Sequence, residues 1–568
     1  MPASTHPPLS AALPPHLRAC VRPIFAVLVV AAVLRFWQLG SMPILYFDSG
    51  AYLGEGRFLA SATERAADAW LHPMPDAPAN PLRRVVEGVA TGTAGHPPDL
   101  GKPGHAILLG LAMLAFGPTT LAAGSVPALA GLGTVAVTYA LGRTGWNRRV
   151  GLVASFLLAV SAEHLVYSRE PLVESTGLFF SALASLAYLR QIIRPRGGSP
   201  GGLLVSGVLF GASFACNNRL SYLPLSLGIV ELVLWRDRGW RHWQPCLPRG
   251  AALAGGFLLP LVVIEATFLA AQAVGNAFGA TPGFLDYAHQ FANFARMNPP
   301  SRARFDQWPT FFADLGMMDG LPVLALFLVG LAVLLIRRAW SRPNVLLATS
   351  LLLPLVLFSV YSSGEVRMRN FSLALPWAML VTAQGLWWLA QHLRYPRAVA
   401  ASALLLIGLL ALPRDLAIAS APSAMPALLA TLQRESIDRL ASTNGPVLSY
   451  YVGEDHTNAR LAQAFINTEA DLRQTAADYP YVEINMQAYW TPGPATTAAE
   501  HATPVFQESN GNDALFLADL LESQGIAWGD WNGVLDVWRQ NRGPATLLRL
   551  YRSADLVPTL ARSATRAS

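Results

Sequence analysis

Residues 148–190 read RRVGLVASFLLAVSAEHLVYSREPLVESTGLFFSALASLAYLR. Two apolar runs, 150–167 and 173–190, flank a short acidic segment, and arginines stand at both ends of the pair. A membrane-spanning helix needs roughly 20 predominantly apolar residues. The stretch therefore predicts two consecutive spans whose connection carries Glu170 and Glu174. The other ends of the two spans carry the arginines and lie at the basic side of a membrane.

The same pattern recurs along most of the chain, which has 568 residues, 53% of them hydrophobic and only 13% charged, with a mean hydropathy of +0.36. Soluble domains carry about 25% charged residues. We therefore predict a polytopic α-helical membrane protein with about 11–13 transmembrane helices. The eleven candidate spans lie near 23–40, 125–142, 150–167, 173–190, 202–216, 221–235, 250–274, 319–336, 344–361, 371–391 and 397–412.

Charge predicts the orientation of these spans. Alternate connections hold fifteen arginines and one acid, Asp237, which marks them as cytoplasmic by the positive-inside rule. The long first loop (41–124) and everything after residue 413 then lie outside. This parity requires that the apolar segment 104–123, which Gly117-Pro118 interrupts, re-enters or lies in the interface instead of crossing.

Residues 414–568 contain no long apolar run and predict a soluble, extracytoplasmic α/β domain. We expect strands at GPVLSYYVG (445–453), YPYVEINMQAYW (479–490) and TLLRLYR (546–552). Helices are expected at HTNARLAQAFINT (456–468) and DALFLADLLESQG (513–525), and a loop at 491–504. The domain shows no metal-ligand spacing, phosphate loop or nucleophile elbow, so we expect it to shape or cover a site on the membrane surface.

The net charge of +6 comes almost entirely from arginine, since Lys102 is the only lysine. The arginines are scattered singly between apolar runs, which argues against a nucleic-acid surface. Two outer segments carry acids next to spans: Asp48 follows the first span, and Glu174 opens the fourth. A carboxylate at this boundary can act as a base or metal ligand toward a lipid-borne substrate, or simply cap a helix.

The order of four motifs resembles the family 39-type, GT-C-fold glycosyltransferases, which include protein O-mannosyltransferases and lipid A aminoarabinose transferases. The motifs are Leu34-Arg35 to Tyr52 around Asp48, GKPGHAILLGLAMLAFG (101–117), the basic turn and acidic loop at 137–180, and RMRNFSLALPWAML (367–380). The resemblance covers roughly residues 30–390. This chain departs from the family pattern at Ser49, at Gly104 and at Asn370-Phe371, where the family has Glu, Pro and Tyr.

The resemblance implies transfer of a sugar, with inversion, from a polyprenyl-phosphate carrier to a glycan, lipid or protein acceptor. Asp48 would be the general base, and Glu174 is the next catalytic candidate. Such a reaction needs fixed cations for the leaving phosphate. The expected substrate- and phosphate-binding residues are Tyr52, Lys102, His105, Arg169, Arg367 and Arg369, with Arg219 as a further outer cation. A carboxylate pair with His105 or Glu174 could also hold a divalent metal ion against the phosphate, although no metal-ligand spacing supports one.

We expect the protein in a bacterial-type inner membrane, with the site and the C-terminal domain facing the periplasm and membrane lipids around the spans. The alternative function is a transporter or flippase for a lipid-linked substrate. Transporters typically show repeated halves and charges at the bilayer midplane. No such repeat is visible, and the acids lie at span ends, which favours surface chemistry. A simple membrane anchor for the outer domain would need only one span.

Overall fold

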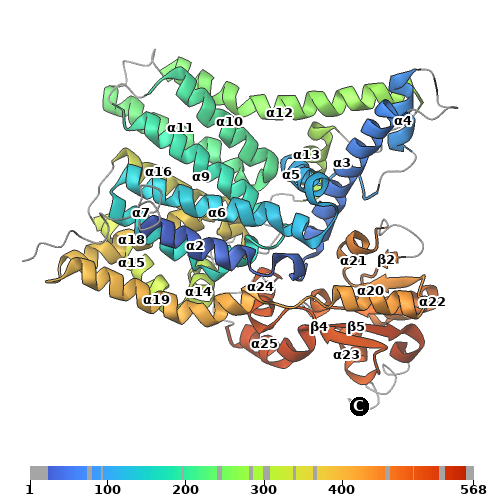
Figure 1. Cartoon of the computed structure of the whole chain (residues 1–568). Helices are drawn as coiled ribbons and strands as arrows, with labels where there is room; N and C mark the ends of the chain where they lie inside the picture. The colour runs from blue at the N-terminus through green and yellow to red at the C-terminus, as the bar shows by residue number, and fades with distance from the viewer. Residues whose placement is uncertain are drawn as a thin grey trace, which may run out of the picture.

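The computed structural model describes residues 23–72, 78, 80–90, 94–194, 198–239, 246–279, 286–297, 308–336, 341–361, 368–453, 461–489, 492–523 and 531–557. A bundle of long helices occupies most of the molecule, and a smaller unit with a β-sheet packs against one end of it (Figure 1). The predicted fold class, a helical membrane protein with a C-terminal α/β unit, is confirmed.

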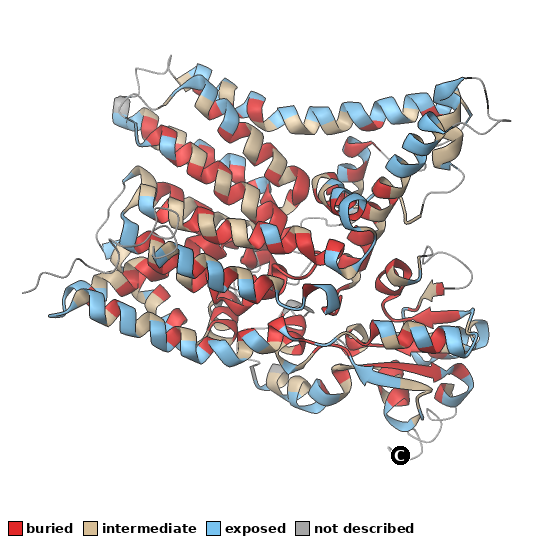
Figure 2. Ribbon diagram, in the orientation of Figure 1, coloured by how far each residue is buried: buried red, intermediate tan, exposed pale blue. Residues whose placement is uncertain are grey.

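Each of the predicted spans contains a helix. In chain order these are α2 (Pro23–Phe36), α6 (Thr120–Gly145), α7 (Arg148–Ala159), α9 (Val173–Ile192), α10 (Pro200–Cys216), α11 (Leu223–Arg238), α12 (Cys246–Ala277), α15 (Leu321–Ile336), α16 (Arg342–Tyr361), α18 (Leu375–Gln391) and α19 (Pro396–Ala419). Within the described residues, four stretches are long and apolar enough to cross a membrane by length and composition alone: 23–41, 120–145, 246–277 and 396–419. Figure 2 shows α12 and α19 with largely exposed surfaces despite their apolar sequences, as expected for helices that face lipid.

The predicted span at 150–167 is divided. Helix α7 ends at Ala159, and the short helix α8 (Ala162–Tyr167) begins after Ser161, whose hydroxyl caps it by accepting from the backbone N–H of His164. The carboxylate of Asp319 reinforces the break, because it accepts hydrogen bonds at 2.8 Å from the Ser161 hydroxyl and from the Ala162 N–H. Backbone groups freed by the break are thus satisfied inside the protein.

The long loop at 41–124, predicted to lie outside, is largely helical. It holds α3 (Phe47–Leu71), α4 (Pro81–Ala90) and α5 (Pro103–Phe116). Helix α5 ends at Gly117, where φ is 70°, as the Gly-Pro pair predicts. With 14 residues it is about 21 Å long, which is shorter than the hydrocarbon core of roughly 30 Å.

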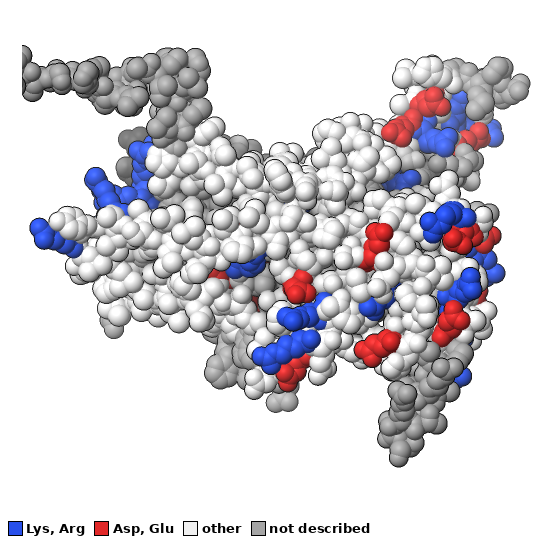
Figure 3. All heavy atoms as spheres, turned by 60° about the horizontal axis from the view of Figure 1, so that its bottom comes forward, with Lys and Arg blue, Asp and Glu red and all other residues white. Residues whose placement is uncertain are grey.

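The arginine-rich ends of the helices meet at one end of the bundle. Arg342 at the start of α16 donates to the carbonyl of Ile192 at the end of α9 at 2.6 Å, and Arg149 stacks on Trp387 with 4.6 Å to the ring centroid. Figure 3 shows basic side chains at one end of the visible face and mixed charges over the C-terminal unit. A broad uncharged surface separates them, as the span and loop pattern predicts.

The C-terminal unit contains a five-stranded sheet in the order β2-β1-β3-β5-β4. Its strands are β1 (Leu440–Ser442), β2 (Leu461–Gln463), β3 (Tyr481–Ile484), β4 (Phe506–Ser509) and β5 (Leu547–Arg552). β1 pairs in parallel with β2 and β3, whereas β5 pairs antiparallel with β3 and β4. Helices α20 (Met425–Arg434), α21 (Gly445–Val452), α22 (Glu469–Asp478), α23 (Pro494–His501), α24 (Asp513–Ser523) and α25 (Trp531–Ala545) surround it.

Local predictions in this unit were only partly right. The expected elements at 481–484, 513–523 and 547–552 are present. The strand expected at 445–453 is wrong: it is helix α21, with Pro446 in its first turn and Gly453 (φ 88°) at its C-cap. The described part of the helix expected at 456–468 contains β2 instead, and the loop expected at 491–504 contains α23. The expected boundary at 413/414 falls inside α19, which continues to Ala419.

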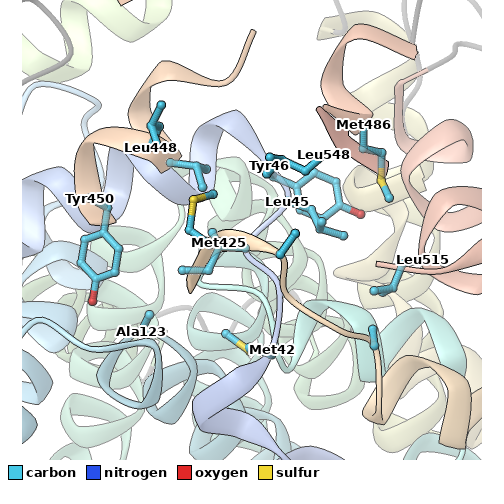
Figure 4. Packing of buried hydrophobic residues seen from close by; sticks show 14 of the residues in the cluster. Met42, Leu45, Tyr46, Ala123, Met425, Leu448, Tyr450, Met486, Leu515 and Leu548 are labelled. Atoms are coloured by element: carbon cyan, nitrogen blue, oxygen red, sulfur yellow. The ribbon is translucent and has the colours of Figure 1, made fainter. Parts of the chain in front are cut away.

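One hydrophobic core joins the C-terminal unit to one end of the helix bundle. Met42, Leu45 and Tyr46, which follow α2, lie in the same cluster as Met425 and other residues of the C-terminal unit (Figure 4). Asn444 adds a hydrogen bond of 2.7 Å from its side-chain amide to the carbonyl of Leu45. The segment that precedes Asp48 is therefore fixed between the two parts of the protein.

Candidate active site

Asp48 lies in the first turn of α3, where the helix dipole favours a negative charge. The turn is held in place by Glu170, whose two carboxylate oxygens accept from the N–H of Leu45 at 3.2 Å and from the hydroxyl of Ser49 at 3.0 Å. The Asp48 side chain is 39% exposed and lines a pocket. An acid in this position is both fixed and accessible.

Arg369 lies in the short helix α17 (Met368–Ser372) and is almost completely buried. Its Nη2 donates to Oδ2 of Asp48, and its Nε lies 3.4 Å from Oε1 of Glu174. The two acids predicted as catalytic thus share one guanidinium. Their approach results from the packing of α3, α9 and α17, which are far apart in the sequence.

Glu174 opens α9 and is buried. Its Oε1 also accepts from Nη1 of Arg219 at 2.8 Å. Arg219 lies in the 3-10 helix η3 (Asn218–Tyr222) between α10 and α11, and the side chain of Asn217 caps this turn. The negative charge of Glu174 therefore compensates two guanidinium groups, which explains how both arginines can be held next to each other in the site.

Lys102 is the N-terminal cap residue of α5 and is buried together with Tyr52 of α3. Its Nζ donates to the Tyr52 hydroxyl and lies 4.9 Å from the centroid of that ring. Burial and the nearby charge of Arg219 lower the pKa of Lys102 to about 7, although Asp48 acts in the opposite direction. This amine consequently changes charge near neutral pH.

Asp48 behaves differently. Burial would raise the pKa of its carboxyl, but the charges of Arg369 and Lys102 outweigh that effect and hold the pKa below its ordinary value. Asp48 is therefore ionised at any physiological pH. It is ready to accept a proton, with a basicity that its ion pair reduces.

His105 is brought close to Tyr52, with ring centroids 5.5 Å apart at 87°. Both of its ring nitrogens are engaged: Nδ1 lies 3.0 Å from the Thr176 hydroxyl and Nε2 lies 3.1 Å from the carbonyl of Pro171. The ring therefore supports the packing of α3, α5 and α9 and has no nitrogen left to bind a phosphate or metal directly.

The remaining predicted residues do not join this cluster in the described part of the chain. Nη1 of Arg169 donates to the carbonyls of Leu34, Arg35 and Trp37 at 2.9–3.1 Å, and so caps the end of α2. Arg367 lies outside the described residues.

A metal ion at the Asp48–Glu174 pair does not fit these contacts. Arg369 bridges the two carboxylates with its positive charge, and a divalent cation there would be repelled. Within the described residues, no group of three or more His, Cys, Asp or Glu side chains has the arrangement of a metal site.

A pocket of about 380 Å³ opens beside Asp48 and Arg369. Tyr46 and Phe47 form the wall on the bundle side, and the C-terminal unit supplies the opposite wall. That wall consists of Thr443, Gln463, Ala464, Phe465, Ile466, Asn467, Gln487, Ala488, Gly493 and Ala495. No sequence pattern indicates a site residue in this domain, because its polar residues form no catalytic motif. For Arg219, the sequence predicts only a general cation on the outer side.

Residues 96–264 match the model of a family described as dolichyl-phosphate-mannose-protein mannosyltransferase. This range contains Lys102, His105, Glu174 and Arg219, while Asp48 and Arg369 lie outside it. No curated protein matches the chain.

Among solved structures, the chain resembles ArnT from Cupriavidus metallidurans in the apo state, with 14% identity and a TM-score of 0.54 over 82% of this chain and 93% of that one. It also matches the Archaeoglobus fulgidus oligosaccharyltransferase AglB in complex with an inhibitory peptide and a dolichol-phosphate. There the identity is 12% and the TM-score 0.48, over 86% and 72% of the two chains. The likeness to ArnT shows the GT-C fold, and with the family match it confirms the resemblance to GT-C glycosyltransferases seen in the sequence.

Proposed function

We propose that this protein is a membrane glycosyltransferase that moves a sugar from a polyprenyl-phosphate carrier to an acceptor on the outer face of the membrane, with inversion at the anomeric carbon. The observation that carries the proposal is the convergence of Asp48, Lys102, Arg219 and Arg369 at one end of an apolar helix bundle. Surface chemistry on a lipid-borne phosphate needs this combination of one base and several fixed cations.

The cations suit the leaving group. When the bond between the anomeric carbon and the phosphate oxygen breaks, the polyprenyl phosphate gains negative charge. Lys102 is buried and the Arg219 side chain is 18% exposed; both are donors near Asp48 and can neutralise that charge with little solvent reorganisation. Tyr52 orients the lysine through the hydrogen bond between its hydroxyl and Nζ.

The base acts on the acceptor. An acceptor hydroxyl beside Asp48 gives its proton to the carboxylate as its oxygen attacks the anomeric carbon from the face opposite the phosphate. The new carbon–oxygen bond forms, the phosphate leaves with the electron pair, and Asp48 later returns the proton to solvent. Arg369 orients the carboxylate and keeps it ionised, and Glu174 orients Arg369 and Arg219.

The proposal places the site and the C-terminal domain, taken as residues 414–568, on the extracytoplasmic side of an inner membrane. It follows from the arginine-rich connections at the other end of the bundle. Reporter fusions test this orientation. A reporter fused after Ser420, just beyond α19, should be active on the extracytoplasmic side, and a reporter fused after Arg238 should be active only in the cytoplasm. Reversal of either result would contradict the orientation.

The function is tested in two steps. Membranes from a strain that lacks the protein should accumulate one polyprenyl-phosphate sugar, which identifies the donor. Purified protein should then convert that donor to polyprenyl phosphate, and Lys102→Met should lower this rate far more than Arg65→Met, which removes an exposed charge further along α3. Movement of intact donor between leaflets of proteoliposomes without its breakdown would favour a flippase instead.

A further inference from the structure

The pocket beside Asp48 has two walls from different parts of the protein. Tyr46, Phe47 and Asp48 belong to the start of α3, and Gln463, Phe465 and Gln487 belong to the C-terminal unit. Its volume of about 380 Å³ lies within the range of small-molecule sites, which is about 300–1,000 Å³. The wall from the C-terminal unit is fixed in place, because Gln463 accepts from the Gly445 N–H at 2.6 Å and donates to the carbonyls of Thr443 and Ala464.

The lining suits a neutral, hydroxyl-rich ligand. Among the described lining residues, the charged side chains are Asp48 and Arg369, and these pair with each other. The others are aromatic, amide, hydroxyl or small side chains, together with the aliphatic Ile466. Aromatic surface with a few fixed polar groups is the usual composition of a site that orients a small polar molecule.

Phe465 provides the aromatic surface. It follows β2, its side chain is 68% exposed, and its ring centroid lies 6.4 Å from that of Phe47 with 44° between the planes. The two rings come from opposite walls and stand at the same pocket. A largely exposed phenylalanine can pack its face against the C–H groups of a sugar ring without any rearrangement of the core.

Gln487 provides a hydrogen-bond acceptor. Gln487 lines the pocket wall, and its Oε1 is shielded from solvent and has no hydrogen-bond partner among the described residues. Its backbone N–H donates to Oδ1 of Asn485 at 2.9 Å, which fixes its position. A shielded amide oxygen without a partner favours a ligand that brings a hydroxyl donor.

Of the charged residues in the candidate site, Asp48 and Arg369 line this pocket. Lys102 and Arg219, the proposed phosphate-binding cations, do not line this pocket. We propose that the pocket binds the acceptor, a carbohydrate or another uncharged hydroxyl-bearing group, and that Phe465 and Gln487 determine its recognition. This inference rests on the proposed transferase function and assigns the C-terminal domain a direct part in it.

The test compares two reactions of the same purified protein with the accumulated donor. The first is slow breakdown of the donor by water in the absence of acceptor; the second is transfer to serially diluted acceptor, extracted in detergent from membranes of the deletion strain. Phe465→Ala and Gln487→Leu should each raise the apparent KM for acceptor tenfold or more, and leave the KM for donor and its breakdown by water within twofold. Phe465→Tyr should restore the acceptor KM. Phe116→Ala, at another exposed phenylalanine outside the pocket, is the matched control.

Two results would overturn the assignment. An unchanged acceptor KM in both variants would mean that the pocket does not bind the acceptor. An equal rise in donor KM would assign the pocket to the donor sugar. If the wild-type protein does not break down the donor at all, the proposed function itself fails, so the two failures are distinguishable. Because Phe465 is exposed, its loss should leave the yield of folded protein unchanged.

Discussion

Arg369 pairs with Asp48 across 321 residues of sequence, and the same guanidinium reaches Glu174 on its other side. The arginine is buried, whereas Asp48 is partly exposed to the pocket. The three side chains therefore have different roles: Glu174 and Arg369 form an internal support, and Asp48 presents its charge at the surface of that support. Substitutions at the two acids should separate these roles.

Glu174→Gln should mainly destabilise the protein. It removes the negative charge that lies 2.8 Å from Arg219 and 3.4 Å from Arg369, and leaves two largely buried cations without full compensation. Breaking a buried ion pair typically costs about 3–5 kcal/mol. The midpoint of thermal unfolding in detergent should fall clearly. Glu87→Gln, which breaks an exposed pair with Arg83, should cost less than about 1 kcal/mol and serves as the control. An unchanged midpoint for Glu174→Gln would contradict the supporting role.

Asp48→Asn should mainly abolish catalysis. The amide keeps the shape of the side chain but cannot accept a proton as a carboxylate does, so transfer should fall by roughly 10²–10⁴-fold. Because the pKa of Asp48 lies below its ordinary value, its ionisation should not limit the rate between pH 5 and 7. Rates at saturating donor measure the effect, with the exposed Asp99→Asn as control. Turnover near that of the wild type would remove Asp48 as the base.

The helices of the bundle were predictable because hydropathy is a local property of the sequence. A run of apolar residues must be helical in lipid, whatever its partners. Short elements of the C-terminal unit are different: α21 has eight residues and β2 has three. Such pieces are marginal alone, and their conformation depends on tertiary packing and on the partner strand, which the sequence does not reveal locally.

The composition of the candidate site was predictable only in part. Acids and cations next to spans indicated Asp48, Glu174, Lys102 and Arg369, because charge at that depth is costly. Arg169 stands next to the same acidic loop, but its guanidinium turns to the end of α2. Neighbourhood in the sequence does not give the direction of a side chain. The pocket wall around Phe465 arises from docking of the C-terminal unit and has no signature in the chain.

The charge of Lys102 should control how donor binding depends on pH. Its pKa is lowered to about 7, so the amine is protonated below that pH and loses its charge above it. A phosphate binds the charged form, and the KM for donor should therefore rise as the pH increases from 7 to 9. Lys102→Arg keeps its charge throughout and should flatten this dependence, and Lys102→Met should show a high KM at every pH. A wild-type donor KM that does not vary with pH would contradict the assignment.

Glu55 should act as a positioning residue for Lys102. Its Oε1 accepts from the N–H groups of Asp99 and Leu100 at 2.8 and 3.0 Å, three and two residues before the lysine. Burial raises the pKa of Glu55 to about 7, so Glu55→Gln resembles the protonated form and keeps the accepting oxygen. We expect Glu55→Leu to raise the KM for donor at least tenfold and Glu55→Gln to change it less than threefold. If both variants raised the KM for donor tenfold, the role would belong to the charge of Glu55 and not to the position of the loop. If neither variant raised it, Glu55 would have no positioning role.

Gly50 should be required for docking of the C-terminal domain. A Cβ at this position would lie 2.3 Å from the backbone nitrogen of Val447 and 2.4 Å from the carbonyl carbon of Pro446, neither of which can move as a side chain does. Glycine to alanine inside a helix normally stabilises by about 0.8–1 kcal/mol. Here overpacking should reverse the sign and cost about 1–3 kcal/mol.

The Gly50→Ala variant should therefore loosen the contact between α3 and α21 and widen the pocket beside Asp48. Hydrogen exchange followed by mass spectrometry should show faster exchange in peptides from 42–52 and 440–453, together with a higher acceptor KM. Gly255→Ala in α12 is the matched control, because an added Cβ there meets nothing within 4 Å. That control should match or exceed the wild type in stability. If Gly50→Ala exchanges and reacts like the control, the tight approach of the two backbones is not what holds the domain over the site.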